Sequence, residues 1–199
     1  MKTLIAPAVL LCLSLGLGCA GERTPANDTG SQGATSHSAP GADGVLHLGA
    51  AVVDAPSGWD FHRPSSSMRL AEAEVPGPAG PALLTVFFFG PGGGGDVQAN
   101  LQRWLGQIEA TPGSTPVERR LEADGFSIWE VTVAGTLLPS TMGAGPTEPM
   151  PGSRLLGAVV EGPGGPWFFK MTGPEDTVSA ASAEFERMLL SVRPAARTT

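Results

Sequence analysis

Residues 82–89, ALLTVFFF, are the best starting point for the fold of this chain, because they form a dense apolar run that leads directly into a glycine cluster. Eight residues are short for a helix, and the β-branched and aromatic side chains in the run favour a strand. A continuous apolar strand is typical of the interior of a sheet with both faces covered. We therefore expect residues 82–89 to be a central strand.

Strand and turn signals precede this run. Residues 45–54 and 59–62 have strand character and are joined by a turn at residues 55–58, APSG. Residues 67–75 alternate imperfectly between apolar and polar positions, and the carboxylates of Glu72 and Glu74 are typical of a soluble edge strand. Three strands are thus predicted ahead of the central one.

Two hairpins are predicted after it. The Asp124-Gly125 pair is a strong two-residue turn signal, and residues 162–166, GPGGP, form a second break between apolar segments. The paired strands are expected at residues 117–124 with 126–136, and at residues 154–161 with 167–172. Residues 167–169 are expected in the core, with Lys170 at the end of this stretch.

Two segments have helical periodicity. In residues 96–109, Asp96 is placed to cap the N-terminus and five apolar side chains fall on one face. Residues 174–190 place Val178, Phe185 and Leu189 on a buried face, and Pro174 suits a first helical turn. Strands outnumber helices, so the predicted class is α+β, a mainly antiparallel sheet flanked by two principal helices.

The N-terminus has the pattern of an export signal. Lys2 precedes an apolar stretch that closes on small residues before Cys19. This ending resembles a bacterial lipobox, in which the cysteine is lipidated and becomes the mature N-terminus. Cleavage after Ala20 and an uncleaved anchor are alternatives, although the apolar run is shorter than the roughly 20 residues that span a bilayer. The resemblance implies anchoring through Cys19 in the bacterial envelope. The lack of aspartate at Ala20 favours an outer membrane, with the protein facing the periplasm or the cell surface.

The chain divides into segments by composition. We expect a signal peptide at residues 1–18 and a flexible tether at residues 19–44, which lack large apolar groups. A single α+β domain is predicted over residues 45–193, followed by a disordered tail at residues 194–199. Two lipid chains give stable anchoring where one is marginal.

Composition excludes several classes of function. The net charge is −7, which argues against nucleic acid as a partner. Cys12 would be lost with the signal peptide, which leaves no thiol pair for a disulfide and no cysteine-rich metal site. No cofactor is expected.

The best candidate binding residues lie on the predicted helix at residues 96–109. Asn100, Arg103 and Gln107 form a polar stripe beside Trp104. Such groups can bind a carboxylate, a sugar or a partner backbone. The alternative is that the stripe is merely the solvated face of an amphipathic helix.

Other chemistry has weaker support. The loop at residues 90–95, GPGGGG, satisfies GxGxxG, but Asp96 places negative charge where an anion would bind. A small hydrolase or a metal-dependent enzyme is an alternative function, centred on His47, Asp60 and His62.

Three segments carry a family resemblance. Residues 90–107 contain the glycine loop and the Asn-x-x-Arg-Trp-x-x-Gln pattern, residues 154–174 contain Trp-Phe-Phe-Lys, and residues 185–193 read FERMLLSVR. Together they resemble a group of uncharacterised bacterial exported lipoproteins, which implies that Asn100, Arg103, Trp104 and Gln107 are family positions. The order of elements is more distantly similar to the PsbP-like fold, which implies a curved antiparallel sheet between helices.

These observations predict a lipid-anchored envelope protein that acts as a non-enzymatic binding or assembly module. Its expected partners are the membrane, through the N-terminal lipid, and an envelope protein or a small ligand. Neither the ligand nor the oligomeric state follows from the sequence.

Overall fold

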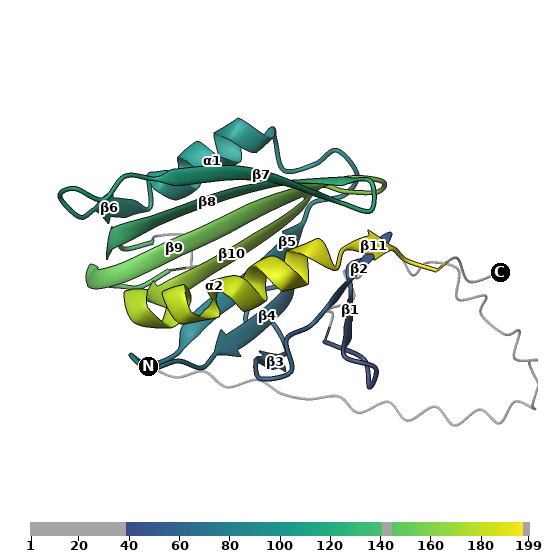
Figure 1. Cartoon of the computed structure of the whole chain (residues 1–199), viewed down its shortest axis with the longest axis horizontal. Helices are drawn as coiled ribbons and strands as arrows, with labels where there is room; N and C mark the ends of the chain where they lie inside the picture. The colour runs from purple at the N-terminus through teal and green to yellow at the C-terminus, as the bar shows by residue number, and fades with distance from the viewer. Residues whose placement is uncertain (1–38, 141–144, 197–199) are drawn as a thin grey trace, which may run out of the picture. The chain divides into compact units, whose positions relative to one another are not determined.

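The structure, a computed structural model, describes residues 39–140 and 145–196. Its main element is an eight-stranded antiparallel sheet with the order β3-β4-β5-β10-β9-β8-β6, in which β7 also pairs with β8 (Figure 1). The strands are β3 (Asp60–His62), β4 (Arg69–Val75), β5 (Ala82–Phe88), β6 (Ile108–Ala110), β7 (Val117–Ala123), β8 (Phe126–Leu137), β9 (Met150–Glu161) and β10 (Trp167–Pro174).

The α+β class with an antiparallel sheet and two helices is confirmed. The apolar run at residues 82–89 forms β5, which lies between β4 and β10 and is therefore an interior strand. Both predicted hairpins form, β7 with β8 across Asp124-Gly125 and β9 with β10. Asp124 and Gly125 have φ values of 45° and 80°, which match the left-handed conformations that a two-residue hairpin turn requires.

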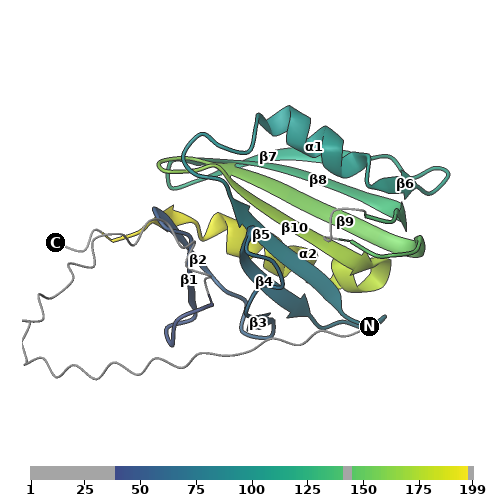
Figure 2. The same cartoon turned by 180° about the vertical axis from the view of Figure 1, so that it is seen from behind.

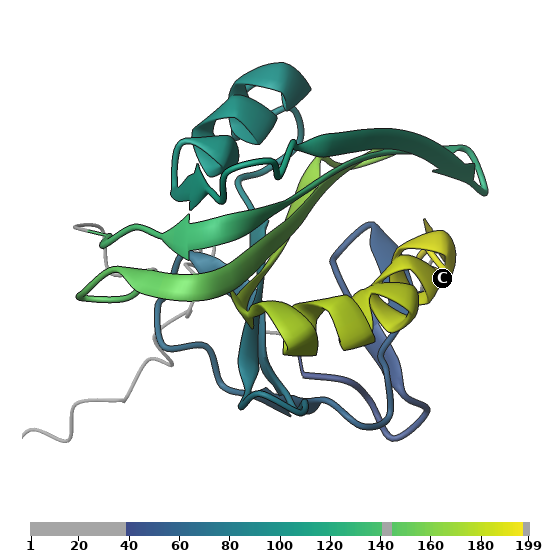
Figure 3. The same ribbon diagram turned by 60° about the vertical axis from the view of Figure 1, so that its left-hand side comes forward.

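The C-terminal helix α2 (Glu175–Leu190) packs in the concave side of the curved sheet (Figure 3). Its apolar face fills the main core together with β5, β8, β9 and β10. Burying one large apolar side chain contributes about 1.5–3 kcal/mol, so this face fixes the helix on the sheet. The predicted face is confirmed, and its buried members are Val178, Ala181, Phe185, Met188 and Leu189.

The first helix, α1 (Val97–Leu105), lies on the opposite side of the sheet over β8 and β9 (Figure 2). Asp96 caps it as predicted, since its carboxylate accepts a hydrogen bond from the Ala99 amide at 2.9 Å. The helix ends at Leu105 rather than residue 109, because Gly106 breaks it and the chain turns into β6. A smaller core of Leu101, Trp104, Ile108, Leu155 and Val159 lies between α1 and the sheet.

The prediction of one strand at residues 45–54 is wrong. Gly49, with φ of 87°, lies in a turn that splits this segment into β1 (Val45–His47) and β2 (Ala51–Asp54). These strands form a separate three-stranded sheet with β11 (Arg193–Pro194). Strand pairing therefore continues past residue 193, and the Ala195 amide donates to the Ala50 carbonyl at 2.9 Å.

The predicted signal peptide and lipidated Cys19 lie outside the described residues, as does most of the tether. Within residues 39–140 and 145–196, no helix is long and apolar enough to cross a membrane.

Candidate functional site

A hollow of about 210 Å³ lies beside α1, over the part of the sheet formed by β4, β5 and β10. We call it the α1 hollow. All four predicted binding residues line it, namely Asn100, Arg103, Trp104 and Gln107, together with Arg69 and Lys170. The helix and the interior strands thus bring basic, amide and aromatic side chains to one place.

Two of the four predicted residues build the wall of the hollow. Asn100 is only 2% exposed, and its side-chain amide donates to the carbonyls of Gly94 at 2.9 Å and Asp96 at 2.8 Å. Trp104 is 5% exposed and packs on Gly157, where an added Cβ would lie 2.5 Å from the indole. Trp104 belongs to the apolar face of the helix, and the burial of Asn100 contradicts the interpretation of the whole stripe as a solvated helix face.

The other two predicted residues remain accessible. Arg103 is exposed and donates to the Asn100 side-chain oxygen. Gln107 lies beyond the end of α1, in the turn before β6, and its side-chain oxygen accepts a hydrogen bond from Lys170 Nζ at 3.0 Å. Arg103 and Gln107 are therefore the members of the predicted set that can contact a ligand directly.

Lys170 is a central member of the hollow that the sequence did not predict as a site residue. It lies within β10 rather than at the end of the core stretch, and strand alternation places it on the α1 side with Phe168 and Thr172. It is only 7% exposed. Burial lowers the pKa of Lys170 to about 8, and repulsion from Arg69 and Arg103 acts in the same direction.

Arg69 enters the hollow from β4, at an irregularity in the pairing of β4 with β5. Its guanidinium is buried and donates from Nη1 to Glu72 Oε2 at 2.5 Å and to Ser65 Oγ at 2.8 Å. Burial alone raises the pKa of Glu72, but hydrogen bonds from Arg69 and Ser65, with the charge of Arg69, bring it below its ordinary value. Glu72 thus holds Arg69 in place as a carboxylate, and it does so in an interior strand, since β3 covers the edge predicted for it.

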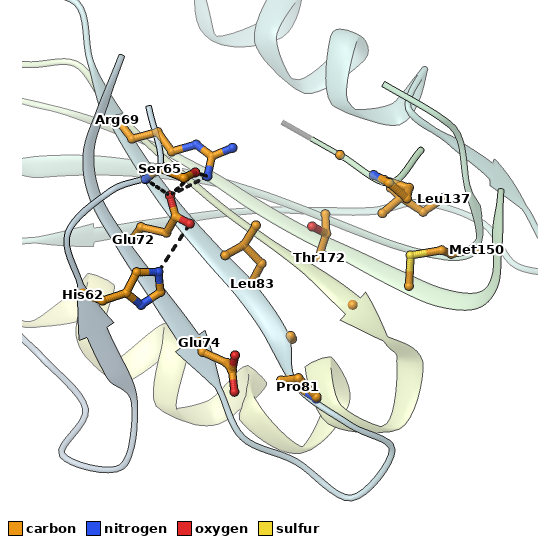
Figure 4. Close-up of a pocket in the computed structure, with 14 residues that line it drawn as sticks. His62, Ser65, Arg69, Glu72, Glu74, Pro81, Leu83, Leu137, Met150 and Thr172 are labelled. Carbon is orange, nitrogen blue, oxygen red and sulfur yellow. Dashed lines mark hydrogen bonds and ion pairs between the residues drawn. The ribbon is translucent and has the colours of Figure 1, made fainter. Parts of the chain in front are cut away.

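A neighbouring pocket of about 450 Å³ shares Arg69 with the α1 hollow. Figure 4 shows Arg69, Ser65, Glu72 and His62 joined along one side of it, with Leu137 and Met150 on the other. The Ser65 hydroxyl donates to Glu72 at 3.1 Å, and His62 Nε2 lies 3.4 Å from the other carboxylate oxygen. In a Ser-His pair, the imidazole would have to accept the hydrogen bond from the serine hydroxyl. Here Glu72 accepts it from Ser65 in place of His62.

The residues of the alternative enzyme hypothesis are divided between two sheets. His47 lies in β1 of the small sheet, whereas Asp60 and His62 lie in β3 of the large one. In the part of the chain that the structure describes, no three His, Cys, Asp or Glu side chains are grouped so as to hold a metal ion.

The glycine loop has a packing role in this structure. Gly90, Gly92, Gly94 and Gly95 all have positive φ, and the Gly92 amide donates to the Gly165 carbonyl in the turn between β9 and β10. At Gly94 an added Cβ would lie 2.5 Å from the ring of Phe168. The loop therefore lets the chain pass closely over β10 and enter α1.

Comparisons with known proteins leave the family open. No family model matches the chain, and no curated protein matches it. It is similar to a crystal structure of PA94, a protein of unknown function from Pseudomonas aeruginosa, with 11% identity and a TM-score of 0.38. That similarity covers 81% of this chain and all of the other. At this level it assigns neither a family nor a function.

Proposed function

We propose that this protein is a lipid-anchored protein of the bacterial envelope that acts as a non-enzymatic binding module, with the α1 hollow as its contact site. The anchor is the lipobox-like Cys19, and the tether is the polar segment that follows it. The observation that carries the binding role is the convergence of Arg69, Arg103 and Lys170 with aromatic side chains in one hollow.

The guanidinium and aromatic side chains of the hollow support a binding role. Guanidinium groups stay protonated at all physiological pH values, so they orient and neutralise a ligand without exchanging protons with it. Aromatic walls supply apolar contact area. The position of the hollow also suits a binding role, because rigid elements of the sheet and α1 hold its side chains.

Extraction of the native protein tests this proposal. The full chain, carrying a C-terminal tag, is extracted from envelopes in mild detergent, and mass spectrometry identifies co-purifying molecules and the processed N-terminus. We expect a diacylated chain that begins at Cys19, and a small molecule or envelope protein that Arg103→Glu fails to recover. The matched control is Arg187→Glu, because Arg187 is an exposed arginine on α2, on the other side of the sheet.

Two results would count against the proposal. A native chain that begins at Gly21 and carries no acyl mass would remove the lipid anchor. Equal recovery of all molecules by the wild type and by Arg103→Glu would remove the α1 hollow as the contact site.

A further inference from the structure

Three positive charges meet in the α1 hollow of an acidic protein. The chain has 12 Lys and Arg residues against 19 Asp and Glu, and its only lysines are Lys2 and Lys170. Arg69 and Lys170 are nevertheless both buried here, and Arg103 lines the same hollow. Like charges brought together away from water repel one another more strongly than they do in water, unless an anion neutralises them.

Two of these cations have hydrogen-bond partners that are neutral. Lys170 donates to the Gln107 amide oxygen, and Arg103 donates to the Asn100 amide oxygen. The ion pairs among the described residues include neither of them, whereas Arg69 is paired with Glu72. Lys170 with its pKa of about 8 is still mostly protonated at neutral pH. The hollow therefore has positive charge that no carboxylate of the described chain balances.

Apolar surface adjoins these charges. Phe87, Phe89 and Phe168 line the hollow with Trp104, and the Phe89 ring lies 5.7 Å from that of Phe168 and 6.1 Å from that of Phe87, between centroids. Phe89 is 45% exposed and Met68, at the rim, is 62% exposed. Large apolar side chains that are exposed to solvent beside buried cations indicate a ligand that has both an anionic and an apolar part.

We propose that the α1 hollow binds a small organic carboxylate, whose carboxylate group lies between Lys170 and Arg103 and whose apolar body rests on Phe87, Phe89 and Trp104. This inference rests on the function proposed above and specifies its ligand class. A hollow of about 210 Å³ is smaller than the roughly 300–1,000 Å³ of drug-sized sites, so the ligand is of the size of phenylacetate.

A carboxylate monoanion fits this environment better than inorganic phosphate, a large part of which is doubly charged at pH 7. Glu72 lies against Arg69 at 2.5 Å and takes up part of the positive charge. The aromatic wall cannot replace the water that a doubly charged group would lose on entry. A carboxylate brings one negative charge and accepts hydrogen bonds from both an ammonium and a guanidinium group.

Calorimetric titration of the full chain at pH 7 tests the proposal with three matched probes. Phenylacetate has the charge and the apolar body, phenylacetamide has the body without the charge, and inorganic phosphate has charge without the body. We expect phenylacetate to bind at least about tenfold more tightly than phenylacetamide, because a hydrogen bond between charged groups contributes more than a neutral one. We expect a similar margin over inorganic phosphate, because phosphate has no apolar body to cover the aromatic wall.

Variants locate the binding. Lys170→Met and Arg103→Gln should each weaken phenylacetate binding about tenfold or more. Arg187→Gln, the same change as Arg103→Gln at an exposed position on α2, should leave it unchanged. Equal binding of phenylacetate and phenylacetamide, or undiminished phenylacetate binding by Lys170→Met, would overturn the proposal.

The two proposals fail in different ways. If phenylacetate does not bind but native extraction recovers a molecule that depends on Arg103, the ligand class is wrong and the binding module stands. If extraction also shows no dependence on Arg103, the function proposed for the α1 hollow fails with it.

Discussion

Replacing Lys170 with methionine is expected to stabilise the domain at neutral pH and to have no such effect in alkali. The pKa of Lys170 is about 8, compared with an ordinary value of 10.5. At about 1.4 kcal/mol for each pH unit, this difference corresponds to about 3 kcal/mol by which burial of the ammonium destabilises the folded state. Methionine fills a similar volume without charge, but Gln107 loses its donor, at a cost of about 1 kcal/mol. The expected net gain at pH 7 is about 2 kcal/mol.

The pH dependence follows from the direction of the shift. Because the folded-state pKa of Lys170 lies below that of the unfolded state, the unfolded chain binds more protons between pH 8 and 10.5. The free energy of unfolding of the wild type therefore rises across that window, whereas Lys170→Met lacks this contribution. Arg69 and Arg103 face the ammonium from β4 and α1, and Gln107, which accepts its hydrogen bond, has no titratable group.

Urea unfolding followed by tryptophan fluorescence at pH 7 and pH 10 measures this effect. Few other side chains of this protein titrate in the same pH range, because the chain has no tyrosine and only one other lysine, Lys2. We expect Lys170→Met to be about 2 kcal/mol more stable than the wild type at pH 7, and the two to agree within about 1 kcal/mol at pH 10. Wild-type and variant stabilities that stay parallel from pH 7 to pH 10 would refute the buried-ammonium reasoning.

Three further substitutions test the surroundings of the α1 hollow by urea unfolding. Gly157→Ala should destabilise the domain by about 1–3 kcal/mol, because the new methyl group would meet the Trp104 indole; an unchanged midpoint would show that the indole moves freely. Asp96→Ala should cost about 0.5–2 kcal/mol by removing the cap of α1, and a cost of zero would contradict the capping geometry. Glu72→Gln should cost about 3–5 kcal/mol, since it removes the carboxylate that pairs with the buried guanidinium of Arg69. This cost should shrink as the pH falls through the lowered pKa of Glu72, where the wild type loses the same interaction, and a cost independent of pH would argue against the ion pair.

Much of the fold follows from local signals in the sequence. Both hairpins were predicted from their turns, one at Asp124-Gly125 and the other at the proline and glycine break of residues 162–166. The helix α2 was predicted from its apolar periodicity. The errors occur where the signal is weak. Residues 45–54 read as one strand, because a single glycine, Gly49, is all that marks the turn between β1 and β2. The helix α1 ends early because Gly106 breaks a periodicity that continues to Ile108.

Four of the six residues that define the candidate site were predictable. The predicted helix at residues 96–109 contains Asn100, Arg103, Trp104 and Gln107, so periodicity alone groups them, although Gln107 lies just beyond the end of α1. Arg69 and Lys170 come from β4 and β10, and only the pairing of both strands with β5 brings them to the same hollow. One signal was present in the sequence, since Lys170 follows three aromatic residues in a chain with a single other lysine. Long-range pairing, in contrast, cannot be inferred from spacing.

Direct titration of Lys170 tests whether the α1 hollow contains a buried ammonium group that can bind an anion. In protein labelled with carbon-13 at the lysine ε-carbon, at most two lysine signals arise, from Lys2 and Lys170. We predict that the Lys170 signal titrates with a midpoint of about 8 and that phenylacetate moves this midpoint to higher pH. A midpoint near 10.5 that phenylacetate leaves unchanged would show that the ammonium group is neither desolvated nor in contact with the ligand.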